Sequence, residues 1–256
     1  MNNSLRLFVQ FTRREIRTRY LGSVTGLAWA FLTPLALLAV YNFVFTYIFK
    51  ARALIADGSF ILFLAAALWP WLAAQEAISR GVMCLSGYAG LIRKVVFPHE
   101  IAVYAVLAGT FALQIFGYFV VLLVLKALGE PVHLRGLLGA VPVLVVMMIA
   151  VTGVTLILAA LQVFIRDIEH ILPPLLMLLM FLAPILYPMS AVPEKMAVLL
   201  SLNPFTWVAN RLRDMLILGD LTPHFGDLVA LCVAVAVLVC GRAFFLRLSP
   251  YFEDFV

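Results

Sequence analysis

Long apolar blocks, separated by short polar stretches, dominate the pattern of this chain. The six blocks span residues 26–49, 59–79, 101–126, 137–164, 171–187 and 226–246. A helix rises about 1.5 Å per residue, so about 20 apolar residues are enough to cross a hydrocarbon core roughly 30 Å thick. The pattern therefore predicts an all-α integral membrane protein with six transmembrane helices, in which residues 1–256 form a single domain.

Composition argues against water as the main solvent of this chain. Hydrophobic residues make up 65% of it and charged residues only 12%, whereas a soluble domain is about one quarter charged. The first block is longer than the core of a signal peptide and no small-residue cleavage site follows it, so we expect a permanent span. The cysteines, Cys84, Cys232 and Cys240, show neither disulfide nor zinc-ligand spacing and are expected to be packing residues.

The distribution of basic residues predicts the topology. An even number of spans places both termini on one side of the membrane, and eleven of the eighteen Lys and Arg residues lie on that side. Because cytoplasmic loops carry an excess of Lys and Arg, we expect both termini to be cytoplasmic. The net charge of +5 does not indicate a nucleic-acid partner, since the basic residues are dispersed and no RNA- or DNA-binding motif accompanies them.

Residues 1–25 carry the pattern of a helix that lies at the membrane interface. Apolar side chains recur at helical spacing along one face, and arginines cluster on an adjoining face. Such a helix buries its apolar face at the headgroup boundary while its arginines meet lipid phosphates. Two interpretations stay open: a simple topogenic anchor, or a surface that recruits the headgroup of an anionic, lipid-linked substrate. The candidate residues for the second interpretation are Arg13, Arg17, Arg19 and Tyr20.

Residues 80–98, between the second and third blocks, are too polar to span the membrane and too numerous for a minimal turn. Just before and within this segment, Glu76 and Arg80 are four residues apart in the order that favours an ion pair along a helix, so we expect a structural pair there. We interpret the segment as a docking element for a partner protein. Its candidate contacts are Gly87, Arg93, Lys94, Phe97 and Pro98.

The fifth block and the residues after it differ from the rest of the chain. Prolines open and close this block, and residues 188–225 separate it from the sixth. They contain an apolar run at 196–200, then a break, and then a helix-like stretch at 205–218. Pieces this short are typical of re-entrant or interfacial helices, which we expect to form a gate at the external mouth of a pathway. The residues assigned to this gate are Tyr187, Pro188, Pro193, Asn203, Pro204 and Arg211.

Aromatic residues gather toward the end of the first block. Tyr41, Phe45 and Phe49 fall on one of its faces, where they could line a channel and stack on the C–H surfaces of sugars. The alternative for each of them is a belt of aromatic side chains that faces lipid at the membrane interface.

The chemistry that the chain can carry is limited by the motifs it lacks. It has no G-x-x-x-x-G-K-[ST] loop, so any ATP and its Mg are expected on another chain, and it has no H-E-x-x-H or G-x-S-x-G motif. We therefore expect neither an enzyme nor a metal site. The blocks also lack the acidic relay of proton-coupled transporters. Their polar side chains, Asn42, Gln114 and Gln162, could line a pathway, but hydrogen bonds between helices are the favoured interpretation.

Four stretches of the chain carry more specific patterns. The first two are RYLGSVTGLAWAFLTPL, at the start of the first block, and LIRKVVFPHEI, before the third. The other two are RDIEHILPPLLMLLMFLAPILYPMSAVPEKM, around the fifth block, and LNPFTWVANRLRDMLILG, after it. In this order they resemble the permease subunits of polysaccharide-exporting ABC transporters, the Wzm-like O-antigen exporters and the teichoic acid and capsule exporters. Ala183 departs from the pattern, since many relatives have Ser before Pro-Ile.

The resemblance implies a homodimer of six-span permeases in a bacterial inner membrane, joined to two copies of an ABC ATPase subunit that binds ATP and Mg. It implies a channel between the protomers for a polysaccharide linked through undecaprenyl pyrophosphate, with O-antigen as the main expectation. It also assigns residues 1–22 to an amphipathic helix, 80–98 to a coupling element and 193–218 to two external gate helices.

Other functions stay open beside this one. Capsule, teichoic acid, drug or small-lipid export would use the same architecture. An intramembrane enzyme that acts on lipid-linked sugars would need paired carboxylates or a His/Asp constellation at one depth, which the sequence does not supply. A passive channel is opposed by the lack of a charge ring or a filter motif.

Overall fold

A computed structural model describes residues 3–20, 26–50, 59–95 and 97–255, and these residues contain helices, turns and no strand. The N-terminal half comprises α1 (Asn3–Tyr20), α2 (Gly26–Phe43), the π-helical turn η1 (Val44–Ile48), α3 (Phe60–Gly87), α4 (Ala89–Ile92) and α5 (Glu100–Ala127). The C-terminal half comprises α6 (Leu134–Phe164), α7 (Ile168–Phe181), η3 (Met189–Ala191), α8 (Glu194–Ser201), α9 (Pro204–Arg213), η4 (Asp214–Leu218), α10 (Phe225–Leu248), η5 (Ser249–Tyr251) and α11 (Phe252–Phe255). The predicted all-α class is confirmed for the described residues.

Five of the predicted spans coincide with helices that are long and apolar enough to cross a membrane. In chain order they are Phe31–Ile48, Phe60–Gly87, Glu100–Ala127, Leu134–Phe164 and Phe225–Phe255. The fifth block, by contrast, forms only the 14-residue helix α7. At about 1.5 Å per residue a helix of that length is shorter than the hydrocarbon core. The chain is a multi-pass membrane protein, and its sixth crossing stays a prediction.

Helix α3 is the centre of the bundle. In its most apolar stretch 72% of the residues are buried, against 11% for α2 and 17% for α10, so those two helices lie on the surface. Helices α5 and α6 both pack on α3. Two buried polar groups are satisfied at the contact with α5, because the Trp69 indole donates to the Gln114 carbonyl at 3.0 Å and the Tyr118 hydroxyl to the Ala66 carbonyl at 3.0 Å.

Glycines allow α6 and α10 to approach each other closely. A Cβ on Gly153 would lie 2.6 Å from the Val237 carbonyl, and one on Gly241 would collide with the Gly153 carbonyl. Small residues at such crossings replace side-chain packing with backbone contact, which is the usual way in which membrane helices associate. The last helix is thereby held against the bundle although most of its surface is exposed.

The polar side chains within the apolar blocks make different hydrogen bonds. Gln114 donates to Glu76 of α3, as predicted for a bond between helices. For the other two, the hydrogen bonds among the described residues are local, and bonds between helices stay a prediction. Asn42 accepts from Thr46 one turn later at 3.3 Å, and the Gln162 amide donates to the nearby Arg166 carbonyl at 3.4 Å.

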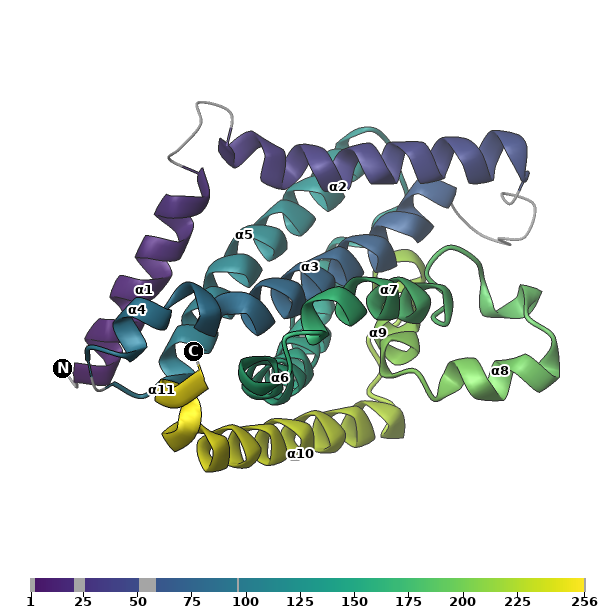
Figure 1. Ribbon diagram of the computed structural model, residues 1–256. Helices are drawn as coiled ribbons and strands as arrows, with labels where there is room; N and C mark the ends of the chain where they lie inside the picture. Colours follow the sequence, from purple (N-terminus) through teal and green to yellow (C-terminus); the bar gives the residue numbers. More distant parts are fainter. Residues whose placement is uncertain (1–2, 21–25, 51–58, 96, 256) are drawn as a thin grey trace.

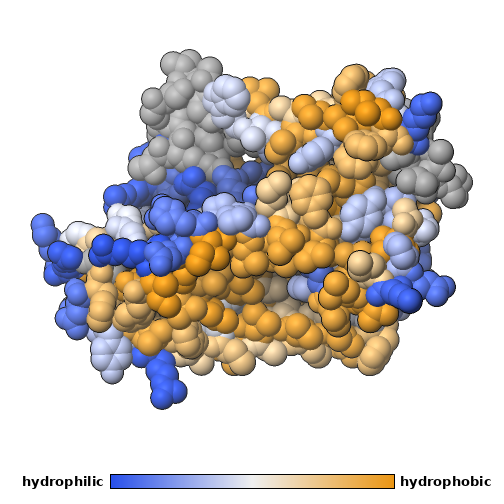
Figure 2. Space-filling view, turned by 45° about the vertical axis from the view of Figure 1, so that its right-hand side comes forward, coloured by the Kyte–Doolittle hydropathy of each residue, from blue (hydrophilic) through white to orange (hydrophobic). Residues whose placement is uncertain are grey.

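The two ends of the bundle differ in what they carry. Helices α1, α4 and α11 gather at the end where both termini lie, whereas α8 and α9 lie at the opposite end (Figure 1). Figure 2 shows a broad hydrophobic surface whose hydrophilic residues concentrate on the left, toward the end that bears the termini. This arrangement suits a protein surrounded by lipid along its middle and by water at its ends.

Candidate functional site

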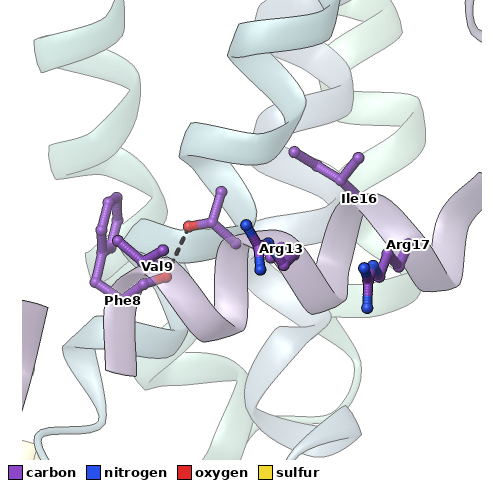
Figure 3. Close-up of a pocket in the computed structure, with 6 residues that line it drawn as sticks. Phe8, Val9, Arg13, Ile16 and Arg17 are labelled. Carbon is purple, nitrogen blue, oxygen red and sulfur yellow. Dashed lines mark hydrogen bonds between the residues drawn. The ribbon is translucent and has the colours of Figure 1, made fainter. Parts of the chain in front are cut away.

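One face of α1 forms an open hollow that combines arginines with apolar side chains. The hollow has a volume of about 420 Å³, and Phe8, Val9 and Ile16 line it together with Thr12, Arg13 and Arg17. Arg13 and Arg17 stand on successive turns beside these side chains (Figure 3). Both are exposed, and neither has a hydrogen-bond or ion-pair partner among the residues that the structure describes.

The other face of α1 is fixed to the bundle. Phe11 is buried, with its ring stacked 5.2 Å from that of Tyr88 and edge-on to Phe97 at 5.6 Å. The Arg14 guanidinium lies over the Tyr88 ring at 5.2 Å. Burial, with the nearby Glu15 carboxylate, raises the pKa of the Tyr88 phenol. One helix face therefore holds the bundle while the opposite face presents Arg13.

An ion pair joins α1 to α3 at the same place. The Arg80 guanidinium donates to the Glu15 carboxylate, and Glu76, its predicted partner, accepts from Gln114 instead. Arg80 lies near the end of α3, which runs beyond the predicted boundary at residue 79 as far as Gly87. The pair therefore links α1 to the helix that leads directly into the predicted docking element.

The docking element has an exposed part and a buried part. Gly87, Arg93, Lys94 and Pro98 are exposed around the short helix α4, and nothing lies within 4 Å of the position a Cβ would take on Gly87. Phe97, in contrast, is only 7% exposed. It packs against Phe11 and His99, so in this chain it anchors the element rather than lying on its surface.

A hydrogen bond closes the docking element onto the end of the chain. His99 Nδ1 lies 3.0 Å from the Ser249 hydroxyl, and its ring contacts that of Phe252. Burial lowers the pKa of His99, which favours the neutral imidazole. Segments from both ends of the sequence thus surround the docking element.

Two of the residues predicted to receive a lipid headgroup fall outside the description. Helix α1 ends at Tyr20, but the side chains of Arg19 and Tyr20 are not among the described ones. The hollow is therefore assigned to Arg13 and Arg17 alone.

The predicted channel aromatics occupy different surroundings. Tyr41 and Phe45 are half-buried against the core, whereas Phe49 is 67% exposed. The Phe45 ring lies 5.4 Å from that of Phe49 and stacks at 5.9 Å on that of Phe60. Phe45 therefore joins the end of α2 to the start of α3, and of the three only Phe49 presents most of its surface.

The predicted gate region folds into α8 and α9, in agreement with the apolar run and the helix-like stretch. Its prolines lie at the boundaries of short helices: Pro188 precedes η3, Pro193 precedes α8, and Pro204 occupies the first turn of α9. Proline suits these positions because its fixed φ fits a first turn that needs no backbone donor. The Tyr187 hydroxyl donates to the Phe181 carbonyl at 2.7 Å, which closes the turn after α7.

Asn203 connects the gate region to α7. Its side-chain oxygen accepts from the Phe205 amide at 2.9 Å, which caps α9. Its amide nitrogen donates to the carbonyls of Leu179 and Leu182 at 3.0 and 3.2 Å. One side chain thus satisfies the start of α9 and the end of α7, whose last carbonyls have no partner within their own helix.

Arg211 connects the gate region to α10. Its side chain is 5% exposed and forms a two-pronged ion pair with Asp227, with nitrogen–oxygen distances of 2.9 and 3.0 Å. It also donates to the Thr222 carbonyl at 2.6 Å. Two-pronged pairs of this kind fix the relative position of the two side chains, which here holds α9 against the start of α10.

Arg213 makes a third connection, which the sequence did not reveal. It is buried and has no carboxylate within ion-pair distance among the described residues. It donates instead to the carbonyls of Phe63, Pro184 and Ile185, and its guanidinium lies 3.4 Å from the centre of the Phe63 ring. In the sequence, Arg213 stands in the polar stretch NRLRD two residues after Arg211, and the charge-based topology places it among the seven basic residues on the external side.

Comparison with known families matches residues 6–217 to the family described as ABC-2 type transporter. The chain belongs to the ABC-2 type transporter family. Its role is therefore transport rather than catalysis, and the predicted family is confirmed. The predicted ATP-driven partnership agrees with membership, since ABC-2 permeases work with an ATPase.

Relatives of this ABC-2 chain carry names from polysaccharide export. It is 30% identical, over 77% of its length and 75% of the relative, to the O-antigen export system permease protein RfbA of Myxococcus xanthus. It is 24% identical, over 97% of its length and 94% of the relative, to the protein of the same name from Klebsiella pneumoniae. It is 27% identical, over 80% of its length and 79% of the relative, to the polysialic acid transport protein KpsM of Escherichia coli.

Proposed function

We propose that this chain is the permease subunit of an ATP-driven exporter that moves a lipid-linked polysaccharide, O-antigen in the main interpretation, out of the cytoplasm. Relatives named for O-antigen export, matched over most of their length, support this function. The proposed assembly is a homodimer in the bacterial inner membrane with two ATPase subunits, six spans per chain and cytoplasmic termini.

The observation that carries the proposal is the two-sided placement of α1. Arg13 and Arg17 lie over an apolar surface on one face, which suits a ligand that has both an anionic headgroup and a lipid chain. The guanidinium group binds phosphate oxygens with two parallel hydrogen bonds, and two arginines on successive turns match the two charges of a pyrophosphate. The hollow therefore supports a polyprenyl pyrophosphate-linked substrate.

The opposite face of α1 supplies the connection to ATP. Phe11 and the Glu15–Arg80 pair hold α1 to the end of α3 and to the docking element. An ATPase that presses on the exposed residues Arg93, Lys94 and Pro98 would therefore move α1 together with the end of α3. In this mechanism the same displacement passes the headgroup from the hollow toward the channel, and all nucleotide chemistry stays in the partner.

An export assay tests the function of the hollow. Arg13→Gln and Arg17→Gln are introduced singly into cells that make the polysaccharide, and surface polysaccharide is measured with a glycan-specific label. Each loss of a charge-assisted hydrogen bond of about 1.5–3 kcal/mol should lower the export rate roughly ten- to a hundredfold. The ATPase should still co-purify with each variant, because the docking element is unchanged.

Arg6→Gln is the matched control, since Arg6 is an exposed arginine of the same helix that does not line the hollow. It should export at the wild-type rate. Equal export by all three variants would show that the hollow has no role in export. A wild-type transporter that exports no polysaccharide would contradict the proposed function itself.

A further inference from the structure

A second pocket lies at the end of the bundle opposite to the termini. It has a volume of about 480 Å³, within the range of roughly 300–1,000 Å³ that is typical of small-molecule sites. Its walls come from three places: the last turn of α2 with η1, the start of α3, and the turn between α5 and α6. None of the roles described above uses this pocket.

The pocket brings together polar groups with spare hydrogen-bonding capacity. Ser59 precedes α3, but its hydroxyl does not cap the helix. As far as the described residues go, the Asn42 side chain bonds through its oxygen alone, which accepts from Thr46. Within the described part of the chain, the Glu130 carboxylate has no hydrogen-bond or ion-pair partner. Amide, hydroxyl and carboxylate groups thus face one space with donors and acceptors to offer.

These groups match a sugar better than other ligands. Each sugar hydroxyl both donates and accepts, which suits a carboxylate, an amide and a hydroxyl placed together. Among the described residues that line the pocket none is basic, so none of them would offer an anionic phosphate a counter-charge beside Glu130. A metal ion would need several ligands, and no group of three His, Cys, Asp or Glu residues that could hold one occurs among the described residues.

An aromatic ring completes the site. Tyr47 lines the pocket and is 70% exposed, with its ring 5.5 Å from that of Phe43. An exposed ring beside hydrogen-bonding groups can cover the apolar C–H face of a sugar while the polar groups hold its hydroxyls. In the sequence, Tyr47 lies alongside Tyr41, Phe45 and Phe49, the three residues to which the channel is assigned.

We propose that this pocket binds a sugar unit of the polysaccharide at the external end of its path, with Glu130, Asn42 and Ser59 as hydrogen-bonding residues and Tyr47 as the stacking surface. The inference rests on the proposed function and adds a site to it. Its physical role is to hold the emerging polymer between successive steps of export, since a polymer with no contact at the exit is free to slide back.

Photo-crosslinking during export tests the site with the polysaccharide that the cell itself makes. Benzoylphenylalanine in place of Tyr47, in the full transporter with its ATPase, should give a high-mass adduct that a glycan stain detects. Benzoylphenylalanine in place of Leu228, which is 58% exposed on α10, should give none. Phospholipid as the main adduct at position 47, or no glycan adduct in cells that export normally, would overturn the site.

Second substitutions then identify the hydrogen-bonding residues. With the crosslinker at position 47, Glu130→Ala should lower the glycan adduct about tenfold, and Glu130→Gln should lower it less because it keeps an acceptor. Glu194→Ala removes an exposed carboxylate from α8, outside the pocket, and should leave the adduct unchanged. If Glu130→Ala gave as much glycan adduct as the wild type, the site would be contradicted. Surface polysaccharide, measured in the same cells, tests the proposed function separately.

Discussion

Two pairs of arginines in this chain have the same side-chain chemistry but differ in burial and in their hydrogen-bond acceptors. Arg13 and Arg17 are exposed on α1, beside an apolar hollow and without a partner among the described residues. Arg211 and Arg213 are buried on α9, where a carboxylate and four backbone carbonyls accept their hydrogen bonds. The first pair has all its donors available for a ligand, whereas the second pair uses most of its donors to bond other parts of the fold; only Nη1 of Arg211 lacks a hydrogen-bond acceptor among the described residues.

This difference teaches that the role of an arginine in a membrane protein follows from its acceptors. A buried charge is tolerated only when hydrogen bonds satisfy it, and groups satisfied in this way hold their neighbours in fixed positions. Arg213 and Asn203 together occupy four carbonyls at the end of α7, so α9 and α7 are expected to move as one body. If charge alone decided the role of an arginine, all four of these residues would be expected to do the same thing.

The largest effect is expected at Arg213. Arg213→Met keeps the apolar stem but removes the Arg213 donor from the Pro184 and Ile185 carbonyls, and a second donor from the Phe63 carbonyl inside α3. At about 1–3 kcal/mol for each buried unpaired group, stability should fall by several kcal/mol. Thermal unfolding of the purified transporter in detergent measures this loss. Arg213→Lys retains the charge without the planar guanidinium, so its stability should be intermediate. Wild-type stability in both variants would show that Arg213 is no more structural than Arg13 and Arg17.

A smaller effect is expected for the Arg211–Asp227 pair. Because both prongs of the ion pair are made and Arg211 is buried, the two residues should be coupled by about 1–3 kcal/mol. Thermal unfolding of Arg211→Gln, Asp227→Asn and the double variant gives this coupling. The double variant should be less destabilised than the sum of the two single ones, and simple additivity would show that the pair does not act as a unit.

The Glu15–Arg80 pair should contribute less, since the Arg80 side chain is 35% exposed. Glu15→Gln is expected to cost at most about 1 kcal/mol of stability. Its larger consequence should be functional, because it loosens α1 from α3 while leaving the docking surface intact. We expect normal co-purification of the ATPase with reduced export per ATP hydrolysed, and an unchanged export-to-hydrolysis ratio would argue against coupling through this pair.

The smallest effect on stability is expected at the hollow itself. Arg13→Gln and Arg17→Gln should leave thermal stability within about 0.5 kcal/mol of wild type, as is usual for exposed side chains. The same variants are expected to lose export. A variant that lost both thermal stability and export would show that Arg13 or Arg17 has a structural role, like Arg211 and Arg213.

The sequence by itself determined the class of this protein and most of its helices. Blocks of about 20 apolar residues have one stable solution in lipid, a helix whose backbone groups are satisfied internally, so five of the predicted spans could be located before any contact was known. The two short helices α8 and α9 could also be located from local residues, because proline and asparagine mark where these helices begin.

Only the tertiary structure decided what individual side chains do. Arg80 pairs with Glu15 rather than with Glu76 one turn away, and Phe97 is buried within the docking element instead of exposed on its surface. Glu130 and Asn42 share a pocket although a long stretch of chain separates them. Apolar periodicity fixes where a helix runs because it depends on neighbouring residues, whereas a hydrogen bond or a pocket depends on which distant segments meet, and that is set by the packing of the whole bundle.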